Sequence, residues 1–162
     1  MFWKMKYASV VGELTLVCDD HALTGLILPG QEIPEGRAEE HPILVQPKNW
    51  LDRYFAGEVP NPAELPLKPA GTPFRELIWK LLLEIPHGKT ATYGQLAQKA
   101  AQILGKPRMS APAVGQALRH NPIPIIIPCH RVLGADGSLT GYAGALEGGL
   151  GIKGALLELE SP

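Results

Sequence analysis

Hydrophobic and polar residues alternate in the first thirty positions of this chain. Leucines stand at every second position at Leu14, Leu16, Leu26 and Leu28, and turn residues separate these runs near residues 11–12 and 19–21. Because successive side chains of a strand point to opposite faces, this alternation predicts a small set of strands over residues 2–29. Residues 30–41 are charged and rich in Gly, Pro and Glu, and they are expected to form a loop.

The spacing then changes to that of a helix. Apolar residues share one face from Pro42 to about Ala56, and Gly57 offers a C-terminal stop. Pro47 either kinks this helix or marks its true first turn. Four prolines between residues 58 and 70 argue against regular structure and indicate a linker. We therefore expect two domains, residues 1–68 and residues 69–162.

Three further helices are predicted in the second domain. Thr72 precedes a proline and a run of apolar residues at helical spacing, which is typical of a capped core helix. Thr92 and Gln95 have the spacing of a capping box, for a helix that continues to about Ala101. Ser110 can cap another helix that ends near Arg119. The two short helices, joined by a Gly-Pro turn, are a helix-turn-helix candidate.

The segment Pro128-Cys129-His130-Arg131-Val132 carries the strongest chemical signal. It follows the apolar run of residues 123–127 and places a thiol next to an imidazole. Three prolines at 122, 124 and 128 exclude a central strand throughout and favour a rigid, extended arm. A free cysteine is mostly protonated at neutral pH, and a neighbouring base or cation makes it a nucleophile. We therefore predict that Cys129 reacts as an ionised sulfur.

Residues 121–132 resemble the active-site signature of the O6-alkylguanine-DNA alkyltransferases. Segments 71–74, 85–90, 92–97, 113–115 and 141–144 follow the order of motifs in that family. The resemblance implies an α+β fold, with a small N-terminal α/β domain like ribonuclease H and a mainly helical, winged helix-turn-helix-like C-terminal domain. It implies direct-reversal DNA repair: one irreversible transfer of an alkyl group, such as methyl, from O6 of guanine to Cys129. O4 of thymine is a second candidate substrate atom.

The resemblance also implies the catalytic roles. His130 takes the thiol proton through a water, and Glu160 orients His130, with Glu158 as a competitor for that role. Tyr93 donates a proton or hydrogen bond to the departing base. No cofactor is implied.

Five residues are expected around the substrate. Asn121 pins the active-site turn, and Lys153 steadies the loop that contains Tyr142, Ala143 and Gly144 at the base pocket. Relative to the family, about four residues are inserted at 145–149, so the resemblance does not determine the width of the base pocket.

DNA binding is assigned by the resemblance to the helix that begins at Ser110. This helix offers mostly small side chains, which suits close approach in the minor groove with little sequence preference. The family commonly has an arginine finger at the position of Pro112 in this chain. Arg108 and Arg119 are the two candidates for the role of that arginine. The predicted DNA-binding residues are Arg108, Ala111, Pro112, Ala113, Gly115, Gln116 and Arg119.

The charge distribution supports a nucleic-acid partner. Residues 1–70 hold six basic and ten acidic residues, whereas residues 71–131 hold eight basic and two acidic residues. The net charge of the whole chain is only −1, so the positive charge is concentrated where the chemistry is predicted.

Composition limits the remaining possibilities. Two cysteines are too few for a disulfide scaffold, and no further Cys or His pair accompanies Cys18 and His21, so no metal is expected. No apolar run has the length of a membrane span, and the first residues do not form a secretory leader. We expect a cytoplasmic monomer that binds double-stranded DNA and no membrane.

Two other functions compete. A sensor of alkylated bases would bind damaged guanine without chemistry, but such relatives replace the cysteine that this chain keeps. A thiol hydrolase would use Cys129 and His130, but it would need an oxyanion hole that no further motif indicates.

Overall fold

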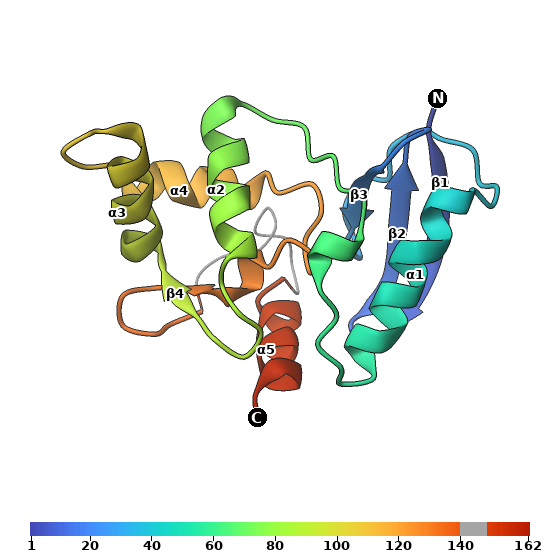
Figure 1. Cartoon of the computed structure of the whole chain (residues 1–162). Coiled ribbons are helices and arrows are strands. Elements are labelled where there is room, and N and C mark those ends of the chain that lie inside the picture. The colour runs from blue at the N-terminus through green and yellow to red at the C-terminus, as the bar shows by residue number, and fades with distance from the viewer. Residues whose placement is uncertain (140–148) are drawn as a thin grey trace. The chain divides into compact units, whose positions relative to one another are not determined.

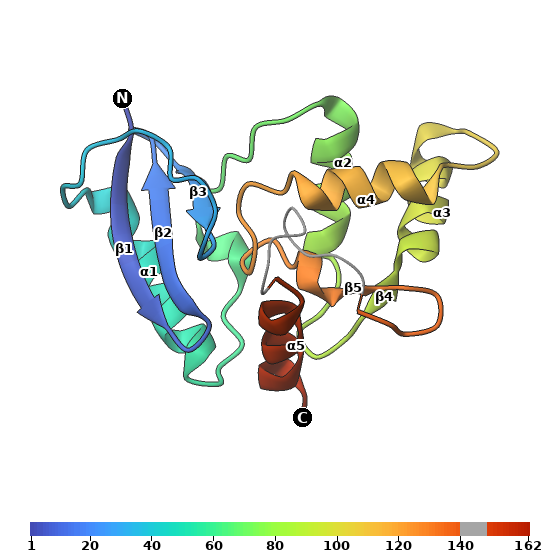
Figure 2. The same ribbon diagram turned by 180° about the vertical axis from the view of Figure 1, so that it is seen from behind.

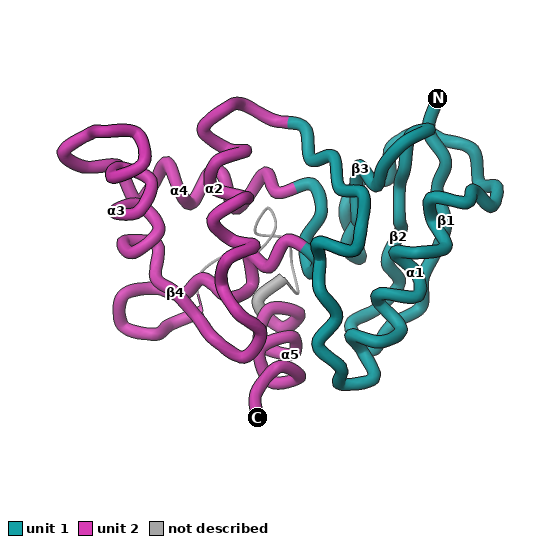
Figure 3. Tube along the Cα trace, in the orientation of Figure 1, with its two compact units in different colours: residues 1–70, 122–126 teal, residues 71–121, 127–162 magenta. Residues whose placement is uncertain are grey.

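The computed structural model describes residues 1–139 and 149–162 (Figure 1). Contacts divide the chain into one unit of residues 1–70 and 122–126 and a second unit of residues 71–121 and 127–162 (Figure 3). The elements of the first unit are β1 (Trp3–Ser9), β2 (Gly12–Cys18), β3 (Leu23–Ile27), α1 (Pro42–Phe55) and the 3-10 turn η1 (Pro62–Glu64). Those of the second unit are α2 (Pro73–Leu83), β4 (Ala91–Thr92), α3 (Tyr93–Leu104), α4 (Ala111–Arg119), η2 (Cys129–Arg131), β5 (Val132–Leu133) and α5 (Gly149–Glu160).

The first unit is an antiparallel sheet of order β1-β2-β3 with α1 against it (Figure 1). The strands predicted over residues 2–29 are confirmed. Strand β2 is central, and every residue from Leu14 to Cys18 is buried, which explains why its sequence departs from strict alternation. The Tyr7 hydroxyl of β1 donates a 2.7 Å hydrogen bond to Asp52 of α1.

Helix α1 confirms the predicted helix and resolves the ambiguity at Pro47. The helix begins at Pro42, where a missing N–H costs nothing, and His41 caps it by accepting a hydrogen bond from the N–H of Ile43. Pro47 is buried inside the helix and does not mark its first turn.

The second unit contains the predicted helix-turn-helix. Thr72, Thr92 and Ser110 are the N-caps of α2, α3 and α4, and the capping box of Thr92 with Gln95 is present. Helix α3 continues to Leu104, three residues beyond the predicted end. It stops at Gly105, whose φ of 66° lies in the left-handed region that favours glycine.

A tryptophan that the sequence did not single out joins two of these helices. Trp79 of α2 is 2% exposed, and its indole N–H donates a 2.8 Å hydrogen bond to the carbonyl of Ala117 in α4. Ala100 of α3 and Ala117 are fully buried. Small residues at these positions allow close helix packing, so part of the alanine content of α4 serves the core.

The approach to Cys129 differs from the predicted extended arm. Residues 122–126 belong to the first unit and contain a turn, and residues 123–126 are buried. The carbonyl of Pro122 accepts a 2.9 Å hydrogen bond from the N–H of Leu26 in β3. Ile125 has a φ of 74°, which is unusual for a β-branched residue and costs on the order of 1–3 kcal/mol. A proline restricts its own φ and the backbone of the residue before it, and Ile125 is followed by Ile126, so no proline restricts the turn at Ile125.

Two short strands and the last helix complete the second unit. Strands β4 and β5 pair in parallel, with Ala91 opposite Val132 (Figure 2). Helix α5 contacts η2, the turn that holds Cys129. No helix within the described residues is long and apolar enough to span a membrane.

Two glycine substitutions test the left-handed C-cap of α3. Gly105→Ala should lower the free energy of unfolding by about 1 kcal/mol, because a Cβ disfavours positive φ. Gly115→Ala is the matched control, since Gly115 is helical and no neighbouring atom lies within 4 Å of the added Cβ. That variant should gain about 0.5–1 kcal/mol. Urea denaturation measures both, and equal effects would contradict the role of the cap.

Candidate active site

Cys129 begins the single 3-10 turn η2, directly after Pro128. Its thiol is 2% exposed, and its backbone N–H donates a 2.8 Å hydrogen bond to the carbonyl of Ile127. The N–H of Arg131 donates to the carbonyl of Pro128 and closes the turn. This backbone bonding fixes the sulfur in a buried position.

Asn121 supports the same turn from the end of α4. Its side-chain amide donates a buried 2.9 Å hydrogen bond to the carbonyl of Ile127. A side-chain hydrogen bond between Asn121 and the thiol lowers the pKa of Cys129. Asn121 therefore contacts both the backbone and the sulfur of the turn.

Burial works against the ionised form in which the sulfur of Cys129 is predicted to react. Burial raises the pKa of Cys129 to about 11, because a thiolate loses its hydration in apolar surroundings. The hydrogen bond from Asn121 and the charge of Lys153 both lower this pKa but do not outweigh burial. A neutral thiol is therefore the resting form, and its proton must leave as the reaction proceeds.

His130 and Glu160 form a buried pair beside Cys129. The His130 side chain is 0% exposed and that of Glu160 is 1% exposed, and Nε2 of His130 lies 2.5 Å from Oε2 of Glu160. Burial lowers the pKa of His130, while the hydrogen bond to Glu160 opposes that effect, so the imidazole is neutral at pH 7. Glu158, the competitor for this role, lies at an exposed position of α5.

The second ring nitrogen of His130, Nδ1, is distinct from the one that contacts Glu160. In the described part of the chain, Nδ1 is buried without a hydrogen-bond partner, and no hydrogen bond joins it to the thiol. When Nε2 donates its hydrogen to a carboxylate, Nδ1 is the basic nitrogen. The pair therefore holds a proton acceptor that is oriented by Glu160.

Arg131 belongs to this cluster and was not predicted to have a role. Its Nε donates a 2.7 Å hydrogen bond to Oε1 of Glu160, and its Nη1 donates to the carbonyl of Ile85 at the same distance. The residue is 8% exposed. A buried arginine needs an anionic partner, and Arg131 follows a run of apolar residues that is expected to be buried. The sequence could therefore have indicated that Arg131 pairs with a carboxylate.

Lys153 and Tyr93 complete the group near the thiol. Lys153 of α5 is 1% exposed, its charge acts on Cys129, and its Nζ lies 5.9 Å from the centre of the Tyr93 ring. Burial lowers the pKa of Lys153, and the neighbouring Cys129 opposes that shift. Tyr93 is half-buried at the first position of α3. The structure thus brings Cys129, His130, Glu160, Asn121, Lys153 and Tyr93 together.

The predicted DNA-binding residues lie elsewhere, on and before α4. Ala111, Pro112, Gln116 and Arg119 are exposed on the helix, Arg108 is exposed in the preceding turn, and Ala113 and Gly115 are half-buried. Val114, Ala117 and Leu118 form the buried face. The outward face of α4 therefore carries small side chains with one cation at its C-terminal end.

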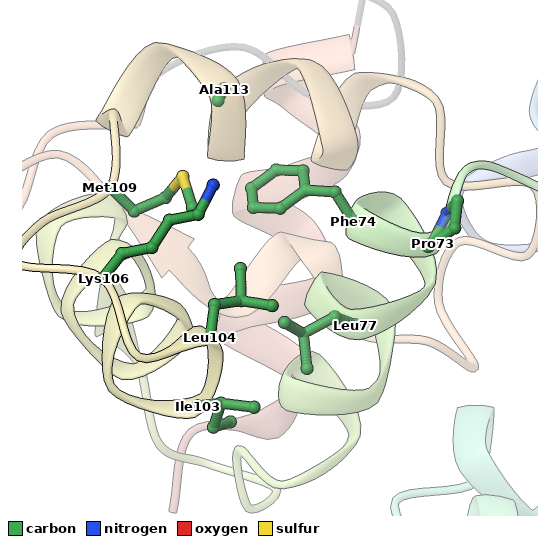
Figure 4. Close-up of a pocket in the computed structure, with 8 residues that line it drawn as sticks. All are labelled: Pro73, Phe74, Leu77, Ile103, Leu104, Lys106, Met109 and Ala113. Carbon is green, nitrogen blue, oxygen red and sulfur yellow. The ribbon is translucent and has the colours of Figure 1, made fainter.

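Three predicted substrate-binding residues, Tyr142, Ala143 and Gly144, lie outside the described residues. A groove of about 600 Å³ is present between α2, α3 and the start of α4 (Figure 4). It is lined by Pro73, Phe74, Leu77, Ile103, Leu104, Lys106, Met109 and Ala113. None of the side chains around the thiol contributes to it, so we assign it no part in the chemistry.

Among residues 1–139 and 149–162, no three His, Cys, Asp or Glu side chains come together in a group that could hold a metal ion. Cys18 is fully buried in β2 and is a free thiol.

Two family models match nearly the whole chain. Residues 3–69 match the 6-O-methylguanine DNA methyltransferase, ribonuclease-like domain, and residues 73–162 match the DNA binding domain of the same family. Proteins named methylated-DNA--protein-cysteine methyltransferase are similar over most of their length. The protein from Methanosarcina acetivorans is 40% identical over 95% of this chain and 95% of its own, and that from Mycobacterium tuberculosis is 44% identical over 94% and 88%.

Solved structures agree with this relationship. Mycobacterium tuberculosis O6-methylguanine methyltransferase has a TM-score of 0.82 and 39% identity, covering 99% of this chain and 93% of the other. Mycobacterium tuberculosis OGT in complex with DNA has a TM-score of 0.83 and 40% identity, covering 99% and 95%. With both domains matched and the α+β fold confirmed, this chain belongs to the 6-O-methylguanine DNA methyltransferase family.

Proposed function

We propose that this protein repairs DNA by moving an alkyl group from O6 of guanine to the sulfur of Cys129. The observation that carries the proposal is a buried cysteine beside a His130–Glu160 pair, in a chain that belongs to this family. Curated relatives of similar length are named methylated-DNA--protein-cysteine methyltransferases. The product is a thioether with no easy reverse reaction, so each protein molecule reacts once.

The displacement needs no bound cofactor. The sulfur forms a bond to the alkyl carbon while the bond from that carbon to O6 breaks, and the electron pair of that bond goes to the guanine. The thiol proton passes through a water to Nδ1 of His130, and the guanine gains one proton. The alkylated base is thereby converted to guanine, and the proton lost by the thiol is balanced by the proton that the guanine gains.

Three other side chains assist this step. The ring of Tyr93 lies 5.9 Å from the Nζ of Lys153, whose charge acts on the sulfur, and this supports a role for its hydroxyl as the donor to the departing base. Lys153 and Asn121 both favour the thiolate as it forms. The neutral resting thiol is therefore activated during attack and not before it.

The base must leave the duplex to reach a sulfur that is 2% exposed. Rotating a nucleotide out of the stack costs a few kcal/mol, and the cost is least for a weakly paired lesion. Small exposed residues of α4 suit the minor groove, and Pro112 occupies the expected finger position as a stiff apolar wedge. Arg108 and Arg119 are exposed near the two ends of α4 and bind phosphates. Since one chain holds all of these groups, we propose that a monomer is active.

Replacing the cysteine tests the transfer itself. Cys129→Ala should take up no label from duplex DNA that carries radiolabelled O6-methylguanine, while its DNA affinity stays within about twofold, because only the acceptor atom is removed. Cys18→Ala is the matched control and should accept one methyl group per protein molecule, as seen by intact-protein mass spectrometry. Repeated turnover would support a thiol hydrolase, and binding without transfer in the unmodified protein would support a sensor.

The protonation state of the thiol gives a second test. By ¹³C NMR of labelled cysteine Cβ in the protein without DNA, Cys129 should titrate with a pKa of about 11. Lys153→Met should move this titration to higher pH, because a charge that favours the thiolate is lost. A titration of Cys129 below pH 9 would show that the resting sulfur is already activated.

Salt dependence tests the proposed phosphate contacts. The logarithm of DNA affinity should fall linearly with the logarithm of salt concentration, since bound phosphates release counterions. Arg108→Ala and Arg119→Ala should each reduce the slope by about one. Arg53→Ala, in the first unit and paired with Glu64, is the control and should leave the slope unchanged. Fluorescence anisotropy provides the measurement, and a flat response would exclude this binding face.

A further inference from the structure

Arg131 connects three segments of the second unit. Its two hydrogen bonds go to Glu160 at the end of α5 and to the carbonyl of Ile85 after α2, and Arg131 itself lies in η2. Glu160 in turn contacts His130, the residue before Arg131. One carboxylate therefore accepts hydrogen bonds from two consecutive side chains through its two oxygens.

The state of this carboxylate determines which nitrogen of His130 is basic. An ionised Glu160 accepts the hydrogen of Nε2 and leaves Nδ1 as the acceptor. A protonated Glu160 would donate to Nε2 and place the imidazole hydrogen on Nδ1, where no proton could be received. Burial by itself favours the protonated carboxyl group, because the charge loses its water.

We propose that Arg131 is a positioning residue that keeps Glu160 ionised and thereby fixes His130 in the tautomer whose Nδ1 accepts the thiol proton. This inference rests on the proposed alkyl transfer. The guanidinium supplies the compensating charge at 2.7 Å and donates directly to Oε1 of Glu160. The other oxygen, Oε2, accepts from the imidazole.

The other charged groups around His130 do not replace this contact. Glu160, Arg131 and Lys153 are the charges that act on the imidazole, and Lys153 also acts on the thiol of Cys129. Lys153 lies on α5 and favours the thiolate, whereas Arg131 lies on η2 and bonds to the carboxylate. The titratable side chains within four residues of Ile85 are Glu84, which pairs with Lys99, and His87 and Lys89.

An arginine suits this position better than a lysine. Nε and Nη1 donate in two directions at once, so one charge neutralises Glu160 and also bonds to the Ile85 carbonyl. A lysine would keep the charge but could not reproduce both bonds with the same geometry. Arg131→Lys and Arg131→Met therefore separate the effect of charge from the effect of shape.

The rate of methyl transfer should respond to the loss of charge. In single-turnover reactions with O6-methylguanine DNA at pH 7, Arg131→Met should be slower by about 100-fold, the usual range for loss of a positioned base. Its rate should rise as pH increases, because Glu160 then loses its proton, and the unmodified protein should show no such step. Arg131→Lys should recover most of the rate. Arg53→Met removes an exposed arginine–carboxylate pair and should have no effect.

A spectroscopic measurement separates this role from simple loss of structure. In ¹⁵N-histidine NMR spectra of the folded protein, His130 should carry its hydrogen on Nε2 in the unmodified chain and in Arg131→Lys. In Arg131→Met the hydrogen should move to Nδ1 at pH 7.

Each outcome is informative. If Arg131→Met folds and keeps the Nε2 tautomer and the normal rate, the proposal is wrong. If that variant does not fold, a Nδ1 tautomer in Arg131→Lys would still refute it. Failure of the unmodified protein to accept a methyl group would instead refute the proposed function and leave the tautomer assignment to the NMR spectra.

Discussion

The hydrogen bond between His130 and Glu160 is the contact on which the rest of the site depends. It joins residues that are 30 positions apart and both are buried, so the carboxylate has little water to solvate it. A buried carboxylate is stable only when its charge is compensated and both of its oxygens accept hydrogen bonds. Arg131 meets that need on one oxygen, and the short turn η2 presents the thiol, the imidazole and the guanidinium in succession.

The scaffold around this contact is specified locally. Helix caps at Thr72, Thr92 and Ser110 set where α2, α3 and α4 begin, and Trp79 ties α2 to α4 through the Ala117 carbonyl. Asn121 follows directly after α4 and holds the carbonyl of Ile127. The rigid core of the second unit thus extends to within two residues of the sulfur.

The sequence predicted the helix starts well because capping depends on neighbouring residues alone. Strand β2, by contrast, lies in the middle of its sheet and is buried on both faces, so alternation identified strands without giving their order. The left-handed φ of Ile125 has no local signal, because only the surrounding packing makes it tolerable. Cys129 is predicted from its own motif, and the residues that act with it are predicted from the resemblance. The sequence indicates that Arg131 needs an anionic partner, but it does not indicate that the partner is Glu160, 29 positions away. The raised pKa of Cys129 depends on burial by several segments.

Burial of Cys129 has a consequence for how long an unused molecule survives. Oxidation to a sulfenic acid requires both thiolate character and access, and this sulfur has little of either at rest. Because each molecule reacts only once, a molecule whose cysteine peroxide had already oxidised could no longer accept an alkyl group. The burial that raises the pKa of Cys129 therefore also protects the sulfur from oxidation until a damaged base is bound.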